Sequence, residues 1–162
     1  MKILRLSEIV GHEILELRYH YVSENEYGLQ SFYAYIKLSG DIIISIPNFD
    51  DDEYLNLTKE NLNYFSERFN TGQLVNEKAK SYFVGQKIID FYFSYYNGEI
   101  DIDFPAIIKL SNNYYLTEIN YGPPGIYVDL SILDERQFQA EVKRRNDAKV
   151  EVRSFNQMKN AS

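Results

Sequence analysis

The most conspicuous group of residues with chemical potential is a run of four acids, Asp50, Asp51, Asp52 and Glu53. Clustered carboxylates can bind a hard cation such as Ca²⁺ or Mg²⁺. Four adjacent side chains cannot all point at one ion, however, and the spaced pattern of an EF-hand loop is absent. We therefore predict no metal site. Two interpretations remain: a solvated loop, or a patch that docks on a basic protein.

A second acidic set alternates along the chain. Glu99, Asp101 and Asp103 share one face if this segment is extended. Charged side chains at the edge of a sheet discourage pairing with other chains. The pattern therefore favours a protected sheet edge over a metal site.

Both histidines, His12 and His20, lie in the first part of the chain. On one continuous strand they would share a face, but eight residues at ~3.3 Å each separate them by roughly 26 Å. They cannot bind one ion together. His20 with Glu16 could form a general base, although exposed polar strand positions explain the same pattern. The chain has no nucleophile elbow, phosphate-binding glycine loop or dinucleotide fingerprint, so we predict no catalytic residue and no cofactor.

Aromatic residues are abundant, with 15 Tyr and 10 Phe but no Trp. Tyr33 and Tyr35 are expected on the strand face opposite the core, and Tyr121 and Tyr127 flank a rigid Gly-Pro-Pro-Gly segment. Tyrosine is enriched at protein interfaces. We predict that these four tyrosines and the acidic run bind a protein. The alternatives are that the second face is covered, so that Tyr33 and Tyr35 are core residues, and that the Gly-Pro-Pro-Gly segment only connects two strands.

These residues lie on a chain that reads as two diverged copies of one unit, over residues 7–70 and 81–145. The aligned blocks are 7–21 with 81–95, 32–39 with 104–111 and 54–65 with 127–138, and 14 of their 35 pairs are identical. A repeat of this kind determines the architecture and is read first. The best-matched positions are alternate residues that we expect to point inward to the core: Phe32, Ala34, Ile36 and Leu38, which return as Phe104, Ala106, Ile108 and Leu110.

Apolar residues alternate with period two in the first strand of each copy, 15–21 and 89–95, which is typical of a half-buried antiparallel strand. Tight turns at 39–41 and 111–113 then join strands 32–38 to 42–46 and 104–110 to 114–119. Short fourth strands at 54–57 and 126–130 lead to helices that begin near Thr58 and Ser131. The predicted fold class is α+β: an internally duplicated β-β-β-β-α unit, mostly antiparallel sheet with one helix per repeat, in a pseudo-twofold arrangement.

The predicted organisation is a first unit at 1–72, a linker at 73–80, a second unit at 81–146 and a tail at 147–162, with both units in one compact domain. Within the tail, a short strand is expected around Val150 and Val152, and residues 156–162 are expected to be frayed. The basic run Lys143-Arg144-Arg145 lies near a predicted helix end, where cations complement the helix dipole.

Composition limits the partners. The 24 acidic and 17 basic residues give a net charge of −7, which argues against nucleic acid. The absence of cysteine excludes disulfides and thiol chemistry and fits a reducing compartment. No signal peptide and no apolar stretch of ~18 residues is recognisable, so we expect a cytoplasmic protein without membrane contact.

The leading hypothesis is a non-catalytic protein-binding module, a bacterial immunity-type inhibitor that binds a basic toxin through an acidic, tyrosine-rich surface. The alternative is a small enzyme or ligand-binding protein with a site at the junction of the repeats, where Glu16, Arg18 and His20 would face Asp90 and Glu118. A third possibility is a structural subunit that assembles through a sheet edge. The oligomeric state is not predicted.

Overall fold

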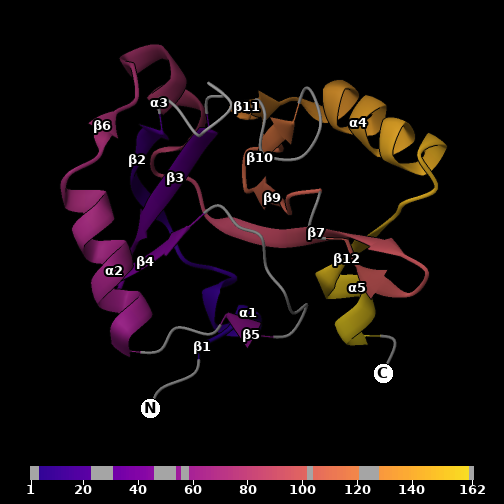
Figure 1. Cartoon of the computed structure of the whole chain (residues 1–162), viewed down its shortest axis with the longest axis horizontal. Coiled ribbons are helices and arrows are strands. Elements are labelled where there is room, and N and C mark those ends of the chain that lie inside the picture. Colours follow the sequence, from indigo (N-terminus) through magenta and orange to yellow (C-terminus); the bar gives the residue numbers. More distant parts are fainter. Residues whose placement is uncertain are drawn as a thin grey trace.

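The computed structural model of the chain describes residues 4–22, 31–45, 54–55, 59–101, 104–120 and 128–160. Their strands form two larger antiparallel sheets and one pair of very short strands. A long helix lies beside each larger sheet, α2 at the left of Figure 1 and α4 at the upper right. The fold is α+β with mostly antiparallel sheet, as predicted.

The first part of the chain contains β1 (Leu4–Arg5), α1 (Leu6–Ile9), β2 (Ile14–Val22), β3 (Ser31–Leu38), β4 (Ile42–Ser45), β5 (Tyr54–Leu55), α2 (Lys59–Asn70) and β6 (Gln73–Leu74). The second part contains α3 (Glu77–Phe83), β7 (Ile88–Tyr96), β8 (Glu99–Ile100), β9 (Ile107–Leu110), β10 (Tyr115–Asn120), β11 (Val128–Leu133), α4 (Glu135–Asp147), β12 (Glu151–Ser154) and α5 (Phe155–Asn160).

The strand order is β4-β3-β2-β6 in the first sheet and β11-β10-β9-β7-β12 in the second, with β8 also paired to β7. By their positions along the chain, β4, β3, β2 and β6 correspond to β10, β9, β7 and β12. These four strands therefore have the same order in both sheets. The strand β5 pairs with β1 and not with β4, which differs from the predicted four-stranded unit.

One apolar core lies against the inner faces of both sheets. Ala34, Ile36 and Leu38 of β3 are buried in the same cluster as Ile108 and Leu110 of β9, as their alternation predicts. Burial of a large aliphatic side chain contributes about 1.5–3 kcal/mol. A smaller second cluster, Ile107, Tyr115, Leu133 and Phe138, lies between the other face of the second sheet and α4.

The two sheets meet at a corner where β2 and β7 begin. The Gly11 N–H donates to the Ile88 carbonyl at 2.7 Å, and the Gly85 N–H donates to the Ile14 carbonyl at 2.8 Å. Both glycines have positive φ, 97° and 85°, which residues with a side chain rarely adopt. A second such pair joins the Ile88 N–H to the His12 carbonyl and the Ile14 N–H to the Gln86 carbonyl, at 2.9 and 2.8 Å. Each hydrogen bond that the first half donates to the second thus has a counterpart donated in the opposite direction.

The predicted tight turns are confirmed. Asp41 and Asn113 both have positive φ, 58° and 66°, and each lies two residues after a serine, Ser39 or Ser111, that comes directly after a strand. The Ser39 and Ser111 hydroxyls accept hydrogen bonds from the Glu13 and Lys87 backbone N–H groups, at 3.0 and 2.9 Å. The turns are therefore fixed to the residues directly before β2 and β7.

Several predicted boundaries were wrong. The helix α4 begins after Asp134, and Ser131 lies inside β11. Asp134 is the stronger cap because its carboxylate accepts from the Gln137 N–H at 2.8 Å while Gln137 Oε1 accepts from the Asp134 N–H at 2.9 Å. The strand β9 begins at Ile107, so the segment from Phe104 to Ala106 is not a strand. In the tail, the expected strand is present as β12, but Phe155–Asn160 is helical where fraying was expected.

Asp134→Ala is expected to destabilise the fold by about 1 kcal/mol, because it removes the side-chain half of this capping box. Urea denaturation of the variant and the parent measures the difference. Asp134→Asn is the matched control, since its amide oxygen can still accept the Gln137 N–H. If Asp134→Asn is destabilised as much as Asp134→Ala, the cap is not the cause.

Candidate functional site

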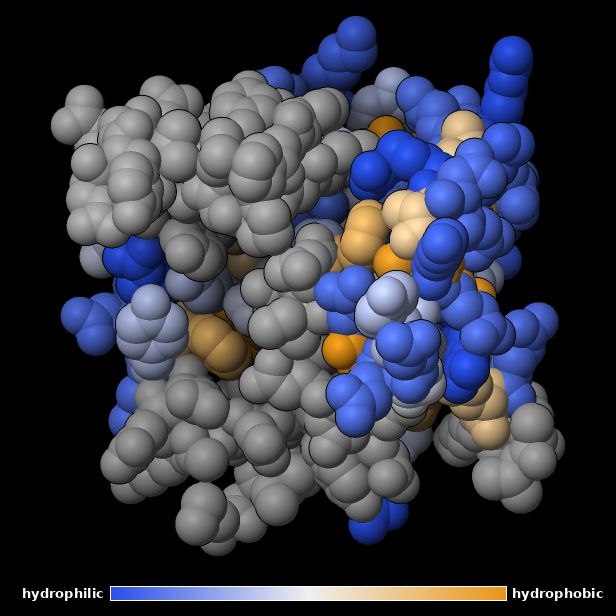
Figure 2. All heavy atoms as spheres, turned by 45° about the vertical axis from the view of Figure 1, so that its right-hand side comes forward, coloured by the Kyte–Doolittle hydropathy of each residue, from blue (hydrophilic) through white to orange (hydrophobic). Residues whose placement is uncertain are grey.

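An open hollow of about 420 Å³ lies at the end of the second sheet. Its lining residues are Tyr96, Glu99, Ile100, Asp101, Phe104, Ala148 and Val150. We call it the acidic–aromatic hollow. Figure 2 turns the right-hand side of Figure 1 forward, and apolar residues there are visible between hydrophilic ones.

The β7–β8 hairpin supplies the first wall. Asn97 and Gly98 form its two-residue turn, and both have positive φ, 50° and 82°. This geometry is the one that an Asn-Gly pair favours between twisted strands. Tyr96 and Glu99 consequently lie directly opposite each other across the hairpin. The Tyr96 side chain is 50% exposed.

The segment after β8 supplies the second wall. The Asp101 N–H donates to the Ser94 carbonyl at 2.8 Å, and the Phe104 N–H donates to the Asp101 carbonyl at 3.1 Å. These two bonds hold the backbone beside β7 and place the Phe104 ring at the hollow. The third wall, Ala148 and Val150, comes from the turn between α4 and β12.

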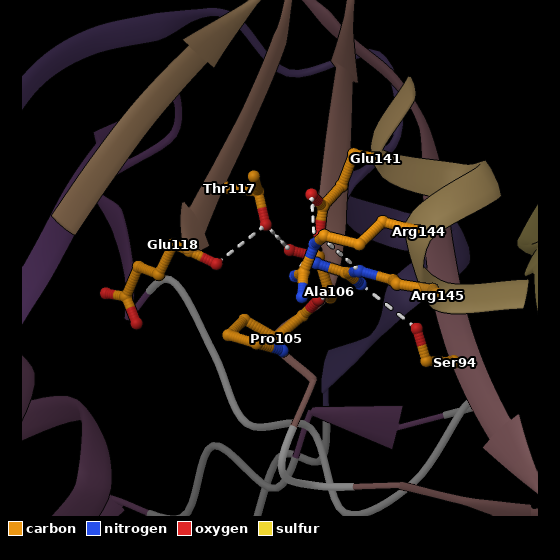
Figure 3. A network of polar contacts seen from close by, with 8 residues as sticks. All are labelled: Ser94, Pro105, Ala106, Thr117, Glu118, Glu141, Arg144 and Arg145. Atoms are coloured by element: carbon orange, nitrogen blue, oxygen red, sulfur yellow. Dashed lines mark hydrogen bonds and ion pairs between the residues drawn. The ribbon is translucent and has the colours of Figure 1, made fainter. Parts of the chain in front are cut away.

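A buried ion pair ties α4 to the second wall (Figure 3). Arg145 is only 1% exposed and donates from Nε to Glu141 at 2.9 Å. Its Nη1 also donates to the Pro105 carbonyl at 2.7 Å and to the Ser94 hydroxyl at 3.0 Å. The guanidinium carbon lies 5.5 Å from the centre of the Phe104 ring. Arg145 thus connects the helix, β7 and the segment that carries Phe104.

Opposing effects act on the carboxyl group of Glu141. Burial disfavours its charged form, but hydrogen bonds from Arg144 and Arg145 outweigh burial and hold its pKa below the ordinary value. In the ion pair between Arg144 Nη2 and Glu141 Oε1, which are 2.6 Å apart, the Arg144 side chain is half exposed. Glu141 therefore stays ionised at neutral pH and balances part of the positive charge beside the hollow.

The charges around the hollow are mixed. Glu99 is exposed and Asp101 is half-buried. Arg144 and Arg145 lie near the Phe104 ring, and exposed Lys149 lies between two wall residues. The carboxylates are thus concentrated on the hairpin side, and the cations on the α4 side.

Glu118 on β10 is a buried acid outside the hollow. Its side chain points away from the Arg145 network in Figure 3 and is 9% exposed. The Ala34 backbone N–H donates to its carboxyl group, yet burial dominates and raises the pKa of Glu118 to about 8. Its Oε1 has no hydrogen-bond partner among the described residues. Ala34 lies just beyond the last pair between β3 and β4, Tyr35 with Ser45.

The polar residues expected at the junction of the repeats do not converge. The Arg18 guanidinium lies over the Phe69 ring of α2 and pairs with Glu16. His20 donates to the Arg68 carbonyl of α2 at 2.5 Å. The other side of the proposed junction is equally separate, since Asp90 accepts hydrogen bonds from Ser154 and Asn156 and Glu118 faces β3. His12 donates to the Ser39 carbonyl at 2.7 Å and supports a turn.

The predicted protein-binding residues are placed as follows. Asp50, Asp51, Asp52, Glu53, Tyr121 and Tyr127 lie outside the described residues. Tyr33 is in β3, where its backbone pairs opposite His20. Tyr35 is 3% exposed and its ring packs against Phe65 of α2, with centroids 5.9 Å apart. The interpretation of Tyr35 as a surface residue was therefore wrong: α2 of the same half covers this face.

Within the described ranges, no group of three His, Asp or Glu side chains is arranged to hold a metal ion. In the same part of the chain, no helix has the length and apolar character needed to cross a membrane. Comparison of the chain with protein-family models, with curated proteins and with solved structures gives no match.

Sequence reasoning noted Glu99 and Asp101 as an acidic edge but did not connect them with Tyr96. The Asn-Gly pair at 97–98, between an aromatic run and alternating acids, is the signal that predicts the hairpin. No local signal brings Ala148 and Val150 to the same place.

Proposed function

We propose that the chain is a protein-binding module that engages a basic protein through the acidic–aromatic hollow. The observation that carries the proposal is the pair of Tyr96 and Glu99 at its rim. An exposed ring next to a carboxylate suits a cationic side chain, because the ring face and the carboxylate both attract positive charge. The net charge of −7 would also steer a basic partner toward the chain.

Within this proposal, the partner is a toxin and the chain is its inhibitor, a bacterial immunity-type protein of the cytoplasm. The support is physical and general: an acidic surface accelerates association with a basic protein, and aromatic anchors then slow dissociation. The acidic run at 50–53 and the tyrosines Tyr33, Tyr121 and Tyr127 remain proposed parts of the surface.

We also propose that the fold is an internal duplication with a pseudo-twofold axis between Glu13 and Lys87. Three observations support it. The two sheets share one order of chain segments, the hydrogen bonds at the corner occur in pairs, and Glu13 and Lys87 form an antiparallel bridge with each other.

The partner is tested by capture and reconstitution. The tagged chain is used to isolate proteins from the native host at low and high salt, and each retained protein is then purified. Support requires one basic protein that forms a stoichiometric complex and loses its toxic or enzymatic activity when the chain is added. A set of candidates that form no complex after purification, or whose activity is unaffected, contradicts the inhibitor proposal.

Glu99→Lys is expected to weaken binding of that partner by about 10-fold or more, mainly through the association rate and more strongly at low salt. Surface-coupled kinetics at two salt concentrations measure both rates. The matched control is Glu67→Lys on the exposed face of α2, which changes the net charge equally. Equal weakening by both variants would indicate only a long-range charge effect, not a contact at the hollow.

A further inference from the structure

We propose that the acidic–aromatic hollow receives an arginine side chain of the partner protein. The guanidinium would lie on the Tyr96 ring and pair with Glu99, and the methylene stem would lie along Val150. This inference rests on the proposed function and specifies which partner group the hollow binds.

The chain itself contains a filled example of this arrangement on the adjacent residue of β7. The Arg153 guanidinium carbon lies 4.4 Å from the centre of the Tyr95 ring, and its Nη2 lies 2.9 Å from the Glu151 carboxylate. An arginine, a tyrosine and a glutamate thus combine at one site on the second sheet. Successive strand residues point to opposite faces, so Tyr96 repeats the ring on the other side of β7.

At Tyr96 the tyrosine and the glutamate are present without the arginine. Glu99 lies opposite Tyr96 in the hairpin, as a carboxylate beside an exposed ring. Neither side chain has a hydrogen-bond, ion-pair or ring partner within the described residues. In contrast, Arg144 and Arg145 already lie near the Phe104 ring on the opposite wall. The aromatic ring and the carboxylate that are available to a ligand, Tyr96 and Glu99, are therefore on the hairpin side.

The surroundings favour arginine over lysine. A guanidinium is planar and weakly hydrated, so it can stack on a ring and bond a carboxylate at the same time. The buried apolar residue Val150 in the lining suits a methylene stem. Lysine has a compact, strongly hydrated ammonium and gains less from stacking.

The nearby cations limit the affinity. Lys149 is exposed between Ala148 and Val150 and would repel a guanidinium. Arg144 and Arg145 are partly balanced by Glu141. Lys149→Ser is therefore expected to strengthen binding of a cationic probe by about two-fold, an effect that diminishes at high salt.

The test uses N-acetyl-arginine amide as the probe, with the full chain isotopically labelled for NMR. We expect saturable shifts of Tyr96, Glu99 and Ile100 at millimolar probe. N-acetyl-lysine amide should bind more weakly, and the uncharged citrulline analogue should leave these signals in place. Absence of shifts with the arginine probe, or equal shifts with citrulline, overturns the inference.

Variants separate stacking from general charge. Tyr96→Ala is expected to weaken binding of the arginine probe about three-fold or more. Tyr96→Phe is expected to retain this binding because the ring face is kept. Glu99→Gln should weaken it similarly. Tyr64→Ala is the matched control, since Tyr64 is an equally exposed tyrosine on α2. Retained probe binding in Tyr96→Ala contradicts the proposed stacking.

The two proposals fail separately. If the probe binds at Tyr96 but no basic partner is found, the arginine site stands and the inhibitor function fails. If a basic partner binds with undiminished affinity to Tyr96→Ala and the probe gives no shift, the protein-binding function stands and the arginine site fails.

Discussion

Glu118→Gln is expected to stabilise the chain at about pH 9 and to change its stability little at about pH 5. The pKa of this buried carboxyl group is about 8, against an ordinary value of 4.5. The folded state therefore favours the protonated acid. The stability associated with the neutral form is fully present below pH 4.5 and is lost as the pH rises from 4.5 through 8.

The expected difference between the two pH values is on the order of 4 kcal/mol, because each unit of pKa shift corresponds to about 1.4 kcal/mol. Glutamine has nearly the same shape as the protonated acid, and its amide oxygen can still accept the Ala34 N–H. It cannot ionise, so the variant should lose the fall in stability between pH 5 and 9. Urea denaturation at several pH values measures the free energy of unfolding of both proteins.

Glu67→Gln on α2 is the matched control, since Glu67 is exposed and the variant loses one carboxylate of the same kind. Its stability profile should follow that of the parent. Parallel profiles for Glu118→Gln and the parent would show that Glu118 is not the group whose ionisation destabilises the fold. A binding assay across the same pH range would then test whether Glu118 affects the partner.

The core could be predicted from sequence because a period-two pattern directly reports which face of a strand is buried. Ala34 and Ile36 were assigned inward together with Ala106 and Ile108, and all four are buried. The pairings of the short strands could not be predicted in this way. The two-residue strands β1, β5 and β6 have too few residues for any period, and long-range contacts determine their partners.

The candidate site was harder to predict than the core for the same physical reason. Tyr35 and Tyr96 look equivalent in the sequence. In the structure, α2 covers Tyr35, whereas Tyr96 lies beside the hairpin turn and is half exposed. The hollow combines a hairpin, an irregular segment and the turn after α4, which lie about fifty residues apart at the extremes. Local patterns predict the hairpin, whereas the position of Ala148 and Val150 depends on how α4 packs.

Glu141→Ala is expected to destabilise the fold by about 3–5 kcal/mol, because it leaves the Arg145 guanidinium buried without a carboxylate. Arg144→Ala, which removes the exposed partner of the same carboxylate, should cost no more than about 1 kcal/mol. Chemical denaturation of both variants at neutral pH measures the contrast. Similar losses in the two variants would mean that the buried pair has no special role.

The acid sensitivity of this pair has the opposite sign to that of Glu118. The pKa of Glu141 lies below its ordinary value, so its ionised form contributes stability above that value, and this contribution is lost as the pH falls through the lowered pKa. The parent should therefore lose stability on acidification where Glu141→Ala does not. A parent that loses no more than the variant on acidification would contradict this assignment.

Replacement of both partners separates stability from the shape of the hollow. Glu141→Leu with Arg145→Met removes both charges from the buried pair, so the double variant should recover most of the stability lost in Glu141→Ala. It cannot restore the hydrogen bonds from Arg145 to the Pro105 carbonyl and the Ser94 hydroxyl. The segment that carries Phe104 would then be held less firmly. Binding of the arginine probe should weaken in this stable double variant if the buried ion pair serves to position the wall of the hollow.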